Sequence, residues 1–144
     1  VPAPLQVFTA SPVLFEAQTG VMGYFQRHDN LDFSVLAAIR YLVSRHRGYD
    51  ACIEFNGKLL LSAGVEPEEL EAMVADPMQG PFDEKERWLV AFAYKSFLDP
   101  KSVTRAYLAK VLAQGWSESD LVDAVYQATF MYFVGNLVHT FAEK

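Results

Sequence analysis

Cys52 is the only cysteine of this chain, so any thiol chemistry takes place there. It lies in the first turn of a predicted helix, in which Asp50 is expected to be the N-cap and Gly64 the left-handed residue at the end. Backbone N–H groups at a helix start favour an anion, and therefore a reactive thiolate. The alternative is a buried structural cysteine that packs like a small apolar side chain.

Tyr49 and Asn56 are predicted to line a pocket with Cys52, because positions 52 and 56 are one helical turn apart. A phenol and an amide can bind or orient a substrate, but they are poor bases near neutral pH. The candidate pocket bases are His46 and His139. For His139 a core position is the alternative.

The remaining sequence features favour no cofactor and no metal site. The three histidines share no metal-ligand spacing with one another or with Cys52. His28 lies in a polar turn and is expected to be solvated. The acidic group around residues 66–71 is interpreted as a solvated helix face, since it lacks the ligand pattern of a calcium loop.

Composition excludes several classes of partner. A net charge of −6 has the wrong sign for a nucleic-acid binder. No apolar run approaches the roughly 20 residues of a membrane span, and no signal peptide is visible. A single cysteine fits a reducing compartment, so a cytoplasmic location is expected.

Apolar residues recur at helical spacing throughout, which predicts a single all-α domain of about seven helices over residues 1–144. Residues 1–10 are expected to form an extended N-terminal arm. The helices are expected near residues 12–26, 31–45, 50–63, 67–74, 84–98, 103–114 and 118–141. The second of these has little room for a polar face and should be central.

With its elements in this order, the chain resembles the carboxymuconolactone decarboxylase / alkylhydroperoxidase-D-like family from about Ser11 to Phe141. The matching features are Ser11-Pro12, Leu36-Ala37-Ala38-Ile39-Arg40, Ala51-Cys52-Ile53 running to Ala63-Gly64-Val65, Phe82-Asp83-Glu84-Lys85-Glu86-Arg87, Gln114-Gly115-Trp116-Ser117 and Gly135-Asn136. The resemblance implies an alkylhydroperoxidase-D-like helical fold. It also implies a homo-oligomer, trimer or hexamer, with the cysteine helix near a pocket between protomers.

The chain departs from the redox branch of that family, which carries Cys-x-x-Cys-x-x-x-His. Cys52 matches the second cysteine, whereas Tyr49 stands at the first and Asn56 at the histidine. The branch also uses a glutamate on the preceding helix, and no acidic residue lies between Asp32 and Asp50. A vicinal-dithiol cycle therefore cannot run within one chain.

Three functions remain open. The first is an antioxidant protein of peroxiredoxin type, in which Cys52 reduces a hydroperoxide and an external thiol restores it. The second is an oligomer that binds a small-molecule ligand or acts as a scaffold without redox chemistry. The third is a cofactor-free decarboxylase or isomerase that uses His46 or His139. A sulfur open to a cavity and near a cation would favour the first.

Overall fold

The structure is a computed structural model that describes residues 3–142, and it confirms the all-α fold. No strand occurs in this range. Eight α-helices follow one another along the chain: α1 (Ala3–Phe8), α2 (Pro12–Gln26), α3 (Phe33–Arg47), α4 (Asp50–Ser62), α5 (Pro67–Ala75), α6 (Glu84–Leu98), α7 (Arg105–Ala113) and α8 (Glu118–Leu137). Short 3₁₀ turns, Pro77–Gln79 and Pro100–Ser102, flank α6, and a π-helical turn, Val138–Ala142, follows α8.

The helix α1 corrects the expectation of an extended arm. Phe8 is only 3% exposed, and its ring packs against Phe15 and Phe133. Such a short helix is marginal by itself, so its contact with α8 stabilises it. The sequence alone does not reveal this long-range contact.

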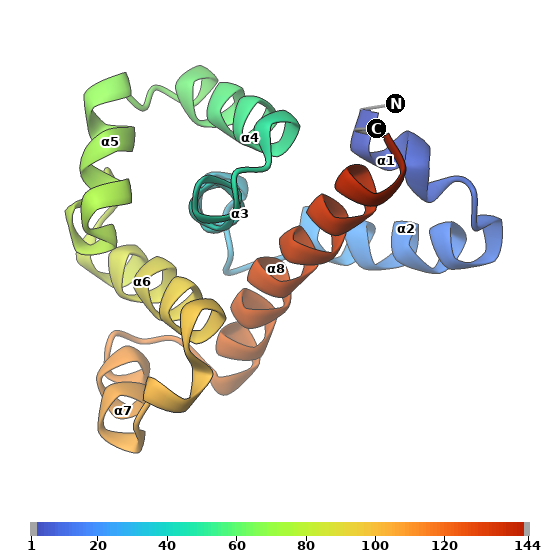
Figure 1. Cartoon of the computed structure of the whole chain (residues 1–144). Coiled ribbons are helices and arrows are strands. Elements are labelled where there is room, and N and C mark those ends of the chain that lie inside the picture. The colour runs from blue at the N-terminus through green and yellow to red at the C-terminus, as the bar shows by residue number, and fades with distance from the viewer. Residues whose placement is uncertain (1–2, 143–144) are drawn as a thin grey trace.

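The helix α3 is central, as its apolar sequence predicted. It contacts α4, α6 and α8, and nine of its residues are buried, among them Ile39 and Val43. Figure 1 shows α3 enclosed by α4, α6 and α8. Because α3 is covered on nearly all sides, a polar residue in its middle has to find partners inside the protein.

The ends of the helices mostly follow the predicted signals. Gly64 has a φ of 97°, as expected for a left-handed helix end, and Ser117 and Asp120 form a capping box at the start of α8. Asp50, however, is not the N-cap of α4. Tyr49 holds that position, and Asp50 is the first helical residue. At this start of α4 the Tyr49 ring is buried, whereas Asp50 is exposed.

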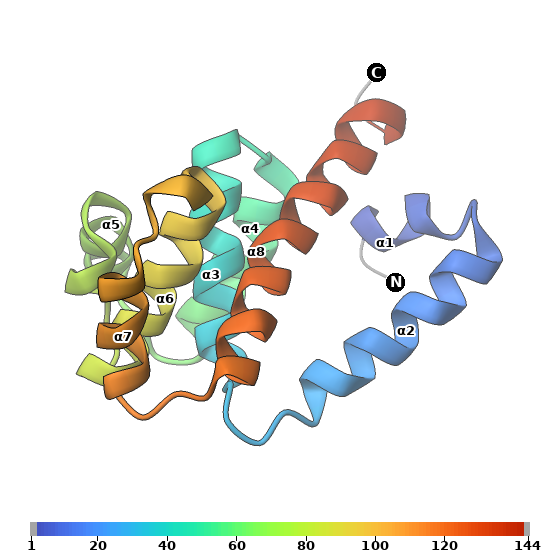
Figure 2. The same cartoon turned by 90° about the horizontal axis from the view of Figure 1, so that it is seen from below.

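The helix α2 extends away from the body formed by α3 to α8, as Figure 2 shows. Its C-terminal end lies close to α8, where Tyr24 and His28 contact Asp123. Among the described helices, none combines the length and apolar character needed to cross a membrane.

Candidate functional site

A cavity of about 340 Å³ lies between α2, α3, α4 and α8, with one residue of α1 at its edge. This volume is within the range of small-molecule sites. Most of its lining is apolar, contributed by Leu5, Met22, Phe25, Phe33, Leu36, Phe55, Leu59, Phe130, Met131 and Val134. The remaining lining residues are Gln26, Arg40, Cys52, Asn56 and Gln127. The cavity therefore offers an apolar space with a small polar group.

Cys52 lines this cavity from the first turn of α4. Its side chain is only 3% exposed, so a reactant would reach the sulfur through the cavity. Cys52 therefore borders the cavity while little of its surface is exposed.

Arg40 projects from α3 into the same cavity and is the only charged residue among the described residues of its lining. Its Nε donates to Asn56 Oδ1 at 2.9 Å, and its Nη1 donates to Gln127 Oε1 at 3.1 Å. Burial lowers the pKa of the guanidinium to about 10, while electrostatic attraction to Cys52 acts in the opposite direction. Arg40 is therefore still a cation at neutral pH, beside the cysteine.

Asn56 connects these two residues. It is 1% exposed, and its Nδ2 donates to the backbone oxygen of Cys52 at 3.0 Å while its Oδ1 accepts from Arg40. The predicted pair of Cys52 and Asn56 thus lines one cavity, one helical turn apart. Sequence reasoning missed Gln127 and the role of Arg40, although an arginine in the middle of the apolar stretch of α3 was a signal for Arg40.

Tyr49, predicted for the same pocket, does not line this cavity. Its ring is buried against Gly135 of α8, where a Cβ atom would lie only 2.1 Å from the ring. Its hydroxyl donates to Asn136 Oδ1 at 2.9 Å. These contacts give Tyr49 a packing role at the junction of α3, α4 and α8.

His46 and His139 also lie outside the cavity. His46 is exposed and packs edge-on against Tyr94 and Phe97. His139 is exposed as well, which corrects the expectation of a core position, and its ring lies 5.2 Å from that of Tyr49. No histidine is among the described residues that line the cavity, so its geometry gives a histidine-dependent decarboxylase or isomerase no support.

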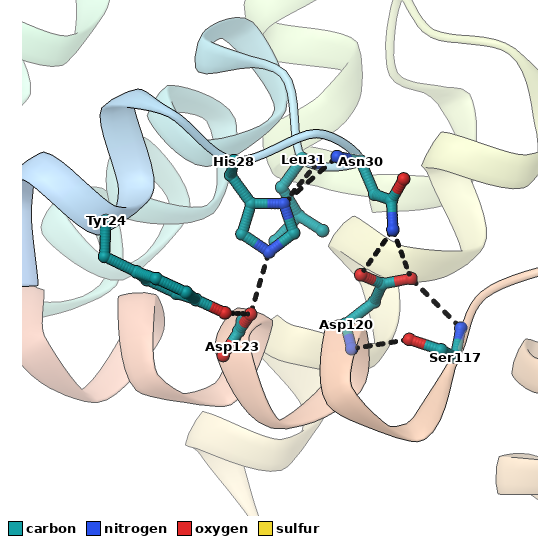
Figure 3. Close-up of polar contacts among 7 residues, drawn as sticks. All are labelled: Tyr24, His28, Asn30, Leu31, Ser117, Asp120 and Asp123. Atoms are coloured by element: carbon teal, nitrogen blue, oxygen red, sulfur yellow. Dashed lines mark hydrogen bonds and ion pairs between the residues drawn. The ribbon is translucent and has the colours of Figure 1, made fainter.

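His28 is not solvated, contrary to expectation, since its side chain is only 7% exposed. Figure 3 shows Nδ1 facing the backbone N–H groups of Asn30 and Leu31, and Nε2 facing Asp123. Because a backbone N–H can only donate, Nδ1 accepts and the ring proton lies on Nε2. Both nitrogens are engaged, so His28 holds the end of α2 on α8 and does not act as a base.

Asp120 extends the same set of polar contacts toward the start of α8 (Figure 3). It accepts from the side chain of Asn30 and from the backbone N–H of Ser117. Burial by itself would raise the pKa of the Asp120 carboxyl, but the hydrogen bonds from Ser117 and Asn30 lower it overall. A charged Asp120 therefore fixes the loop that leads from α2 into α3.

Within residues 3–142, no group of three or more His, Cys, Asp and Glu side chains is arranged to hold a metal ion. Arg40, Asn56 and Gln127 supply one cation and amide groups. The cavity is therefore better suited to an anion than to a metal cation.

Comparison with known structures identifies a class of fold. The chain is similar to an uncharacterized peroxidase-related protein from Silicibacter sp. TM1040, known from a crystal structure at 1.70 Å resolution. The TM-score is 0.75 at 18% sequence identity, and the match covers 89% of this chain and 68% of the other. The two proteins share a fold, in agreement with the alkylhydroperoxidase-like fold expected from the sequence. No protein-family model matches the chain, and no curated protein matches its sequence.

Proposed function

We propose that this protein is a divergent alkylhydroperoxidase-D-like enzyme that reduces organic hydroperoxides through Cys52. One observation carries the proposal: Cys52 lines an apolar cavity together with the partly buried cation of Arg40. A cation next to a thiol favours the thiolate, which is the nucleophilic form. The apolar lining suits the organic part of a hydroperoxide.

In the proposed reaction the Cys52 thiolate attacks the distal oxygen of the hydroperoxide. The O–O bond breaks, an S–O bond forms, and the alkoxide takes a proton to leave as the alcohol. The sulfur is then a sulfenic acid. An external dithiol attacks this sulfur and releases water, and its second thiol restores the Cys52 thiol as the dithiol becomes a disulfide.

Because Cys52 is the only cysteine of the chain, no second thiol in it could resolve the sulfenic acid. The proposed cycle therefore requires an external reductant. A thiol-dependent cycle is compatible with the expected cytoplasmic location, where reduced thiols are abundant. The second candidate is a ligand-binding protein without redox chemistry. It is favoured by Asn56, which stands where the redox branch has a histidine and here holds Arg40 instead.

The test is consumption of cumene hydroperoxide with dihydrolipoamide as the reductant. We expect consumption by the unaltered protein and loss to background in Cys52→Ser. Ala51→Ser, a neighbouring change that also introduces a hydroxyl in the first turn of α4, should keep the activity. Dimedone should label the unaltered protein after a pulse of hydroperoxide. Absence of consumption by the unaltered protein, or equal rates in Cys52→Ser, would reject the peroxidase.

A further inference from the structure

The positive charge of Arg40 is held by side chains that carry no negative charge. Its two hydrogen-bond partners, Asn56 and Gln127, are neutral amides that are 1% and 5% exposed. Among the described residues, the ion pairs involve Arg45 and Lys58, and none involves Arg40. Arg40 is only partly exposed, and a charge withdrawn from water is costly unless an opposite charge accompanies it. The cavity thus holds a positive charge that a ligand could neutralise.

The two amides also fix the direction of the guanidinium. They accept from Nε–H and from Nη1, and among the hydrogen bonds between described residues none uses Nη2, which is the nitrogen that we expect to meet a ligand. Hydrogen bonds from a guanidinium to a carboxylate are charge-assisted and therefore stronger than those between neutral groups. Apolar side chains from α2, α4 and α8 surround the rest of the cavity.

We propose that this cavity binds a carboxylic acid with an apolar body, with the carboxylate on Arg40 and the body among the apolar side chains. For the enzyme, the corresponding substrate is a hydroperoxide of such an acid. That identification of the substrate rests on the proposed peroxidase function, whereas the binding does not. Asn56 and Gln127 act as positioning residues, because they hold the guanidinium without contacting the carboxylate.

Isothermal titration of the full chain with decanoate tests the binding, with decanol and decyltrimethylammonium as probes of the same apolar length. A charge-assisted hydrogen-bonded pair predicts that decanoate binds at least about tenfold more tightly than decanol. The ammonium compound should bind more weakly than decanol, since it meets a like charge. This comparison uses only the unaltered protein, so its result is independent of whether any variant folds.

Variants then locate the site. Arg40→Met should lose the preference for decanoate over decanol, and Arg40→Lys should retain part of it. Arg47→Met is the matched control on the same helix, because the Arg47 guanidinium stacks on Tyr132 outside the cavity.

The outcomes separate this inference from the proposed function. Decanoate binding without hydroperoxide consumption would support the ligand site and reject the peroxidase. Consumption without a preference for decanoate over decanol would support the peroxidase and reject the ligand site. An unchanged preference in Arg40→Met would also reject the assignment to Arg40.

Discussion

At the scale of single residues, the structure gives its polar side chains two distinct roles. Arg40 and Asn56 meet Cys52 at a cavity, where Asn56 holds the guanidinium that we propose meets a ligand. His28 and Asp123 have most of their polar atoms engaged with neighbouring helices and loops. The sequence alone predicted that His28 would be solvated. Its two occupied nitrogens show why it is structural.

His28→Phe should destabilise the protein by about 2 kcal/mol, because the ring is kept while three hydrogen bonds are lost. Two backbone N–H groups would be left without their acceptor. Urea unfolding followed by circular dichroism measures the change. Tyr24→Phe is the control, since it removes the hydrogen bond from an exposed tyrosine to Asp123 and should lower the stability clearly less than His28→Phe does. Equal stability of His28→Phe and the unaltered protein would contradict the structural role.

At the scale of helices, an ion pair connects α3 and α5. Arg45 donates from Nη1 and Nη2 to the two carboxylate oxygens of Glu71, at 2.8 and 3.2 Å. The hydrogen bond from Arg45 lowers the pKa of Glu71 below its ordinary value of 4.5, and the attraction between the two charges adds to this effect. The pair is exposed at Glu71, so salt should weaken it.

The lowered pKa of Glu71 predicts a dependence of stability on pH. Since the folded pKa is below the unfolded value, the stabilisation is fully present above pH 4.5 and is lost as the pH falls through the folded pKa. Glu71→Gln should therefore be less stable than the unaltered protein near neutral pH, and the difference should shrink on acidification. Free energies of unfolding over this range measure it.

Glu68→Gln is the control for that measurement. Glu68 is exposed on the same helix, and none of the ion pairs among the described residues involves it. Its substitution should leave the dependence of stability on pH nearly unchanged. A difference between Glu71→Gln and the unaltered protein that stays constant from neutral to acidic pH would argue against the pair.

At the scale of the whole molecule, α2 presents apolar side chains to solvent. Val13 is 82% exposed and Leu14 is 50% exposed, on a helix that extends away from the α3 to α8 body (Figure 2). Exposed apolar surface of this kind favours association. We propose that a second copy of the chain covers this part of α2, in the homo-oligomer, trimer or hexamer, expected from the sequence.

Size-exclusion chromatography with light scattering tests the oligomer. The unaltered protein should elute as a trimer or hexamer, and the double variant Val13→Lys, Leu14→Lys should shift toward the monomer. Glu68→Lys on α5 is the matched control, because both variants make the net charge more positive by the same amount. A monomeric unaltered protein would reject the proposal, as would a double variant with unchanged mass.

The sequence by itself determined the fold class, because the helical spacing of apolar residues and the cap residues are local properties. Gly64 and the Ser117–Asp120 capping box are examples. It also placed Cys52 and Asn56 on one side of α4, since a helix has a fixed period.

Only the tertiary structure decided which distant residues join that pair. Gln127 is far along the chain from Arg40, and no local pattern predicts that α8 brings them together. The same holds for Phe8, whose burial against α8 makes a helix of the expected arm. Tyr49, three residues before Cys52 in the chain, turns instead toward Gly135 because the absence of a side chain there leaves room for its ring. The physical reason is common to all three: packing between helices depends on contacts that sequence spacing does not encode.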